Sequence, residues 1–113
     1  MKRNNHESSK TDCYVPTPTD ITVFERRYEH EHVPMAVAKL AGKTRFDANL
    51  IMADPGQEQA PYHRIAEVYF PSMKDLEDCL SSPGGQETAA HAVEISSGGD
   101  PLFLIAEVET FVF

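Results

Sequence analysis

The spacing of residues around His32 places an imidazole where a catalytic base could act. Phe24, Tyr28 and His32 follow one another at intervals of four residues, which puts their side chains on one face of a helix. The residues between them are mostly charged, so this face should turn away from water. Burial lowers the pKa of an imidazole and keeps it neutral near pH 7. We therefore predict that His32 is a general base or a hydrogen-bond anchor for a small ligand, with Phe24 as a ligand-binding neighbour. The alternative is a core histidine bonded to a carbonyl or carboxylate group.

Three tyrosines and one arginine could complete such a site. Tyr28 lies one helical turn before His32, while Tyr62, Arg64 and Tyr69 share one strand-like segment. A phenol or a guanidinium stabilises the negative charge that develops on an enolate or phenolate. We predict catalytic roles for Tyr28 and Arg64 and ligand-binding roles for Tyr62 and Tyr69. In the structural alternative, the arginine pairs with an acidic residue across the sheet and the tyrosines fill core volume.

The sequence does not point to a metal site. His30 and His32 are two residues apart, so a helix turns their side chains about 200° away from each other. The chain has neither a His-Glu-x-x-His motif nor a pair of cysteines with zinc-site spacing. The other histidines, among them His63 and His91, are expected to be scattered over the surface. We predict no metal and no cofactor.

Composition limits the classes of partner. The chain has 113 residues, of which 41% are hydrophobic, and its 10 basic and 18 acidic residues give a net charge of −8. An acidic surface repels phosphate backbones, so nucleic acid and anionic membranes are not expected partners. No apolar run approaches the roughly 18 residues of a membrane-spanning helix, and the start lacks a signal-peptide core. We expect a soluble cytoplasmic protein that binds a small molecule.

The beginning of the chain predicts a tail, a short strand and a helical region. Residues 1–10 are polar and are expected to form a flexible tail, with one domain over residues 11–113. A short strand is predicted at residues 13–15, before two prolines. Thr19 or Asp20 can cap the helix that carries Tyr28 and His32. Pro34 should interrupt this helix and start a second one, through Met35, Ala38 and Leu40, which ends at Gly42.

The rest of the chain alternates strands with helices. Alternating apolar residues predict strands at residues 43–53 and 61–70, and an apolar run predicts a last strand at residues 102–108. In the second of these, Tyr62, Arg64, Ala66, Val68 and Phe70 should share one face. Ser72 and Ser82-Pro83 begin two helices. The order predicts an α+β fold of the ferredoxin-like β-α-β-β-α-β type, with an antiparallel four-stranded sheet and helices on one face.

The face of the sheet without helices should be a partner site. We expect it to carry much of the apolar alternation of the second and third strands, which water would otherwise contact. Two copies packed sheet to sheet would cover this surface. The sequence therefore predicts a homodimer with a shared barrel-like core.

Four stretches of the sequence are similar to the EthD family, named for ethyl tert-butyl ether degradation, in the dimeric α+β barrel superfamily. They are YEHEHVP (28–34), APYHRIAEVYF (60–70), SPGGQ (82–86), and SGG (97–99) followed by AEV (106–108). They occur in the order that the family has, and the resemblance covers roughly residues 20–109. It implies the dimeric barrel fold and supports a role for His32.

The resemblance leaves two kinds of function open. One is an enzyme that acts on a small apolar, aromatic or polyketide-like compound, as a cofactor-free oxygenase, an isomerase or a cyclase. The other is a non-catalytic accessory protein that carries a ligand for a separate oxygenase system. Since one fold hosts many reactions, the resemblance cannot choose between them.

Overall fold

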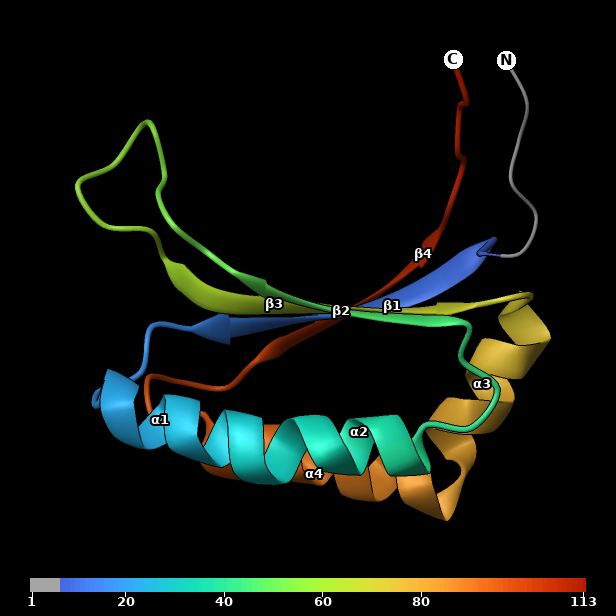
Figure 1. The fold of residues 1–113 in the computed structure, drawn as a ribbon, viewed down its shortest axis with the longest axis horizontal. Helices are drawn as coiled ribbons and strands as arrows, with labels where there is room; N and C mark the ends of the chain where they lie inside the picture. Colours follow the sequence, from blue (N-terminus) through green and yellow to red (C-terminus); the bar gives the residue numbers. More distant parts are fainter. Residues whose placement is uncertain (1–6) are drawn as a thin grey trace.

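The computed structural model describes residues 7–113 and shows a four-stranded antiparallel sheet with helices against one face (Figure 1). The elements are β1 Ser9–Pro16, α1 Ile21–Arg27, the π-helical turn η1 Tyr28–His32, α2 Val33–Lys39, β2 Arg45–Leu50, β3 Tyr62–Phe70, α3 Met73–Ser81, α4 Pro83–Ile95 and β4 Leu102–Glu107. The strand order is β2-β3-β1-β4. This arrangement confirms the predicted α+β, ferredoxin-like fold.

The first strand is longer than the sequence pattern indicated. β1 begins at Ser9, which is buried, and pairs with both β3 and β4 along its length. The predicted tail therefore ends too late, because Ser9 and Lys10 belong to the strand; residues 1–6 of that tail lie outside the described residues. The sequence did not reveal the start of this strand because its residues are polar and lack apolar alternation. Lys10 and Asp12, for example, form an ion pair with an N–O distance of 3.3 Å.

A second α-helix begins beside Pro34, as predicted, but the chain does not break there, because a π-helical turn joins α1 to α2. Asp20 caps α1 by accepting a hydrogen bond from the Val23 N–H at 3.1 Å. The wider turn η1 follows, in which the Val33 N–H donates to the Tyr28 carbonyl, five residues earlier. Pro34 has no N–H to donate, and its ring would clash with the carbonyl group four residues earlier. A wider turn before the proline avoids the clash and does not need the missing hydrogen bond.

The wider turn also changes which residues of this region are buried. Ala36 and Leu40 continue the buried face of Tyr28 and His32, whereas Met35 is half-buried and Ala38 is exposed. The predicted inward face of residues 35–40 is therefore wrong at Met35 and Ala38. With the π-helical turn, the buried residues follow at intervals of four from Phe24 to Leu40.

A bulge changes the faces of β3 near its start. Val15 of β1 pairs with Arg64, and Pro16 pairs with Tyr62, so His63 is an extra residue. Tyr62 consequently turns to the face without helices, where its ring lies 5.3 Å from that of Tyr14. Arg64 stays on the helix side, so the predicted shared face of Tyr62 and Arg64 is wrong.

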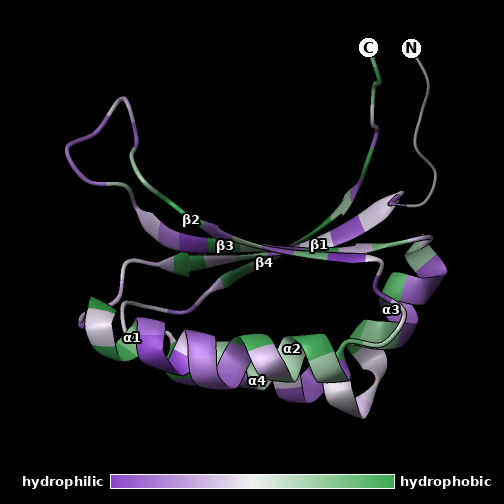
Figure 2. Cartoon of the chain, in the orientation of Figure 1, coloured by the Kyte–Doolittle hydropathy of each residue, from purple (hydrophilic) through white to green (hydrophobic). Residues whose placement is uncertain are grey.

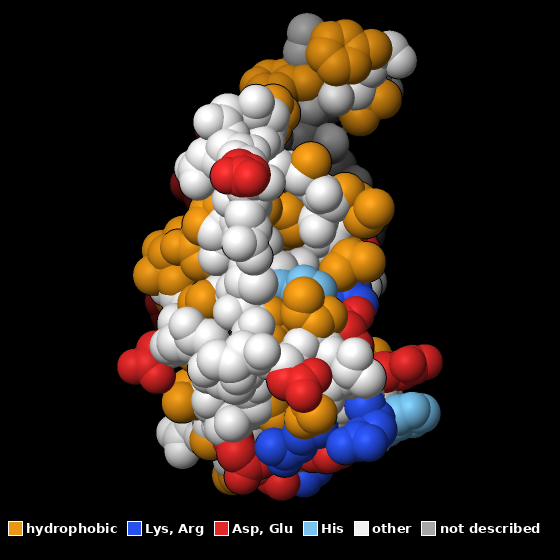
Figure 3. Space-filling model, turned by 90° about the vertical axis from the view of Figure 1, so that its left-hand side faces the viewer, with side chains coloured by type: hydrophobic (Ala, Val, Ile, Leu, Met, Phe, Trp, Pro, Cys, Tyr) orange, Lys and Arg blue, Asp and Glu red, His pale blue; other side chains and the backbone are white. Residues whose placement is uncertain are grey.

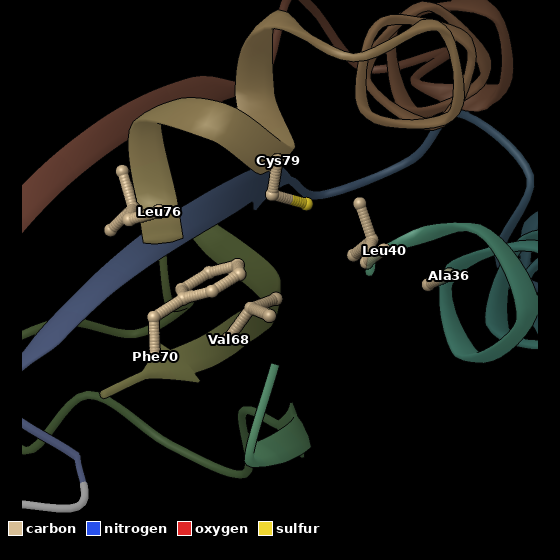
Figure 4. Packing of buried hydrophobic residues seen from close by; sticks show 6 residues of the cluster. All are labelled: Ala36, Leu40, Val68, Phe70, Leu76 and Cys79. Carbon is tan, nitrogen blue, oxygen red and sulfur yellow. The ribbon is translucent and has the colours of Figure 1, made fainter. Parts of the chain in front are cut away.

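The core lies between the sheet and the helices. One cluster joins Ala36 and Leu40 of the first helical region to β3 and α3, with Phe70 and Leu76 fully buried and Cys79 nearly so (Figure 4). A second cluster packs Phe24 and Tyr28 against β1 and α4.

The face without helices is charged at its centre, which corrects the expectation of an apolar surface there. Lys10 contacts Glu67 at 2.7 Å, and the hydroxyl of Tyr69 donates to Glu67 at 3.2 Å. Exposed apolar residues occur instead along β4, where Leu102 and Leu104 are each 45% exposed, and in the chain end after it (Figure 2). Hydrophobic side chains also gather where the chain end projects from the body, at the top of Figure 3.

Candidate functional site

A cavity of about 70 Å³ lies between the sheet and the helices, and His32 lines it. All four strands, η1, α2, α3 and α4 contribute residues to its wall. Small residues leave the space open, among them Ala36 of α2, Ala66 of β3 and Ala92 of α4. The cavity is mainly apolar, and the polar residues of its wall besides His32 are Thr11, Asp12 and Thr88.

His32 is held in an apolar setting, as the sequence predicted. The residue is 6% exposed, and burial together with the nearby His91 lowers the pKa of its imidazole to about 4. The ring is therefore neutral at pH 7. Its Nδ1 lies 2.9 Å from the Nδ1 of His91, so one of these two nitrogens donates a hydrogen bond and the other accepts it.

Sequence reasoning missed the role of His91, which it placed at the surface. The His91 side chain is 10% exposed, and its Nε2 lies 3.1 Å from the Oε1 of Glu31. Arg27 in turn donates to Glu31 at 2.9 Å and to Glu94 at 2.8 Å. These contacts form a hydrogen-bonded chain from the surface to the cavity. The only indication of this hydrogen-bonded chain in the sequence was Glu31, the residue immediately before His32.

Phe24 and Tyr28 stack in a row with His32 but do not line the cavity, which corrects the predicted composition of the pocket. Ring centroids are 5.4 Å apart from Phe24 to Tyr28 and 5.6 Å apart from Tyr28 to His32. The Tyr28 hydroxyl is buried without a hydrogen-bond partner in the described part of the chain, and burial raises its pKa to about 12. The Tyr28 ring thus stacks on the His32 ring, which also stacks with the ring of His91.

Arg64 also lies outside the cavity lining. Its Nε donates to Glu25 of α1 at 3.1 Å, and its guanidinium stands 5.0 Å from the centre of the Tyr28 ring. The hydrogen bond from Arg64 lowers the pKa of the Glu25 carboxyl. Glu25 Oε2 is also 3.3 Å from His63 Nε2, because the bulge turns both His63 and Arg64 of β3 toward α1. Arg64 thus fixes the aromatic row rather than facing the cavity.

Tyr62 and Tyr69, the two predicted ligand-binding tyrosines, lie apart from His32. Tyr62 lines a second hollow, of about 260 Å³, beneath the loop between β2 and β3, together with His63. Tyr69 lies on the face without helices, with the Arg45 guanidinium 4.9 Å from its ring centre. The third strand therefore gives the cavity only the apolar residues Ala66 and Val68.

Cys13 is a cavity residue that the sequence did not single out. It comes from the centre of β1, and burial raises the pKa of its thiol to about 12. A thiol with such a pKa stays protonated at pH 7 and is a poor nucleophile. Cys13 therefore contributes surface to the cavity rather than reactivity.

Within residues 7–113, no cluster of three or more His, Cys, Asp or Glu side chains has the arrangement needed to hold a metal ion. The same part of the chain has no helix long and apolar enough to cross a bilayer.

Comparison with known proteins shows where this architecture occurs. A crystal structure of an EthD family protein from Bacillus halodurans has a TM-score of 0.80 at 19% identity, over 89% of this chain and 98% of that one. A dimeric ferredoxin-like protein of unknown function from Bacteroides fragilis gives 0.64 at 12% identity, over 95% and 100%. A hydroxynitrile lyase from Passiflora edulis gives 0.69 at 14% identity, over 95% and 99%.

Sequence comparison identifies the family. An uncharacterized 11.0 kDa protein from the thcB-thcC intergenic region of Rhodococcus erythropolis is 32% identical over 82 residues, which are 73% of this chain and 78% of that protein. The family model of the EthD domain matches residues 17–96, from the end of β1 to the end of α4, and this stretch contains His32, His91 and Glu31. The chain therefore belongs to the EthD domain family.

Proposed function

We propose that this protein binds a small, mainly apolar molecule in the cavity beside His32, and that His32 removes a proton from an acidic O–H or C–H group of it. The observation that carries the proposal is the buried imidazole itself. Its low pKa keeps it neutral, and its Nδ1 is engaged by His91. Its Nε2 has no hydrogen-bond partner in the described part of the chain, so this nitrogen is free to accept a proton.

The volume of the cavity limits the ligand. A dry cavity of about 150 Å³ holds benzene, whereas this one measures about 70 Å³. A ring compound therefore requires that lining side chains move. Phe103 is suited to this, because it lines the cavity from the edge strand β4 and is 44% exposed.

Proton exchange on simple probes tests this proposal. Phenol serves as a binding probe, followed through the ring resonances of His32 by NMR, and exchange of the C3 protons of 2,4-pentanedione in D₂O serves as the reaction. We expect phenol to shift the His32 signals, and exchange to be faster with the wild type than with His32→Gln. The variant His30→Gln is the control, since His30 is exposed on the same turn. Phenol binding without accelerated exchange would favour the accessory, ligand-carrying role, and absence of both would overturn the proposal.

We also propose that two copies pair through the face without helices. Leu102 and Leu104, both exposed on the edge strand β4, lie on this face because they pair with Tyr14 and Asp12 of β1. A second copy would cover them, and the ferredoxin-like structure from Bacteroides fragilis, which this chain resembles in fold, is described as dimeric. Sedimentation equilibrium should give about twice the chain mass of 12.6 kDa at micromolar concentration; a mass equal to one chain would contradict the pairing.

A further inference from the structure

We propose that Glu31 and His91 are positioning residues that fix the tautomer of His32, so that the proton of its neutral ring lies on Nδ1 and the lone pair lies on Nε2. The catalytic importance of this tautomer rests on the proposed function, whereas the tautomer itself can be measured without it. It follows from the order of the three side chains, Glu31 at the surface, His91 in the middle and His32 at the cavity.

Glu31 determines the direction of the chain of hydrogen bonds because it is ionised. The guanidinium of Arg27 donates to it from Nε at 3.1 Å and from Nη2 at 2.9 Å. Two bonds from Arg27, and one from His91, lower the pKa of the Glu31 carboxyl to about 2. A carboxylate only accepts hydrogen bonds, so His91 must carry its proton on Nε2, which is 3.1 Å from Glu31 Oε1.

The second step follows from the chemistry of a neutral imidazole. With its proton on Nε2, His91 has a lone pair on Nδ1. The Nδ1 atoms of His91 and His32 are 2.9 Å apart, a distance at which two lone pairs would repel. His32 must therefore donate from Nδ1, and its Nε2 is left with the lone pair.

The same contacts provide a route for the proton. When His32 Nε2 accepts a proton from a ligand, the proton on His32 Nδ1 can pass to His91 Nδ1. His32 is then neutral again with its proton on Nε2, and His91 is an imidazolium beside the Glu31 carboxylate. When His32 Nε2 returns its proton to the ligand, the proton on His91 Nδ1 moves back to His32 Nδ1, and the three side chains regain their starting state. No other reactant is needed.

A second glutamate in the neighbourhood supplies a matched control. Glu94 accepts a hydrogen bond from Arg27 at 2.8 Å, as Glu31 does, but its carboxylate lies 4.0 Å from His91 Nε2. The change Glu94→Gln removes a charge from the same cluster without altering the partner of His91. The change Glu31→Gln puts an amide at that position, which can donate to His91 Nε2 and so reverse the chain.

The tautomers are measured directly from the ¹⁵N shifts of the histidine rings at pH 7 without any ligand. We expect a protonated Nδ1 on His32 in the wild type and in Glu94→Gln, and a substantial population protonated on Nε2 in Glu31→Gln. A wild-type His32 protonated on Nε2, or a Glu31→Gln tautomer identical to that of Glu94→Gln, would overturn the inference. Because no ligand is present, a failure of phenol binding or exchange leaves this result unaffected and counts against the proposed function alone.

Discussion

The Nδ1 atoms of His32 and His91 lie 2.9 Å apart, although the two residues are separated by 59 positions in the sequence. Their rings are nearly parallel, with an interplanar angle of 9°. The contact joins the π-turn η1 to α4 and places a pair of imidazoles between the surface carboxylate Glu31 and an apolar cavity.

Replacing His32 by alanine should lower the free energy of unfolding by about 1–3 kcal/mol. The change leaves His91 Nδ1 without its partner and removes a buried ring from the aromatic row. Urea unfolding followed by circular dichroism measures the loss. His30→Ala is the control and should stay within about 0.5 kcal/mol of the wild type, because His30 is exposed. Equal losses in the two variants would contradict the structural role of the contact.

The pH dependence of stability should show a contribution from His32. Its pKa is about 4 in the folded state and about 6.5 when unfolded, so the unfolded chain binds more protons between these values. This contribution is fully present above pH 6.5 and disappears as the pH falls toward 4. It amounts to at most about 3 kcal/mol. The difference between the wild type and His32→Gln in urea unfolding from pH 4 to 7 isolates it; a difference that does not vary with pH would refute the buried neutral imidazole.

Replacing Gly85 by alanine should destabilise the protein by about 1–3 kcal/mol. A Cβ atom at this position would lie 2.0 Å from the carbonyl oxygen of Cys79, so α3 and α4 would have to separate beside the cavity. Gly56→Ala is the control, since its nearest contact, Asp54 Oδ1, is at an ordinary 3.5 Å. Thermal unfolding compares the two. Similar melting temperatures would show that the close approach of the helices is not needed.

Replacing Leu104 by lysine should prevent the proposed pairing of two copies. The new charge would lie on the face without helices, opposite Asp12, where a second copy would have to bury it. Val93→Lys introduces the same charge on α4, at a residue with the same 45% exposure, and should leave the mass unchanged. Sedimentation equilibrium distinguishes the outcomes. A dimeric Leu104→Lys protein would place the contact elsewhere.

Local chemistry allowed much of the fold to be predicted from the sequence. Asp20 and Ser72 each accept a hydrogen bond from a backbone N–H three residues later, and Gly42 takes the left-handed φ of +86° that ends the helical region. These features depend on neighbours within a few residues, so a sequence pattern contains them. The same holds for the inward direction of His32, which four-residue spacing indicated.

The composition of the site was decided by contacts between distant parts of the chain. The bulge at His63 depends on the register between β1 and β3 and reverses the face of Tyr62, which alternation alone had placed beside Arg64. The contact with His91 depends on how α4 packs over η1, and no spacing within either helix encodes that distance. Periodicity shows which face of an element is buried, but only the packing of elements on one another decides which buried side chains meet.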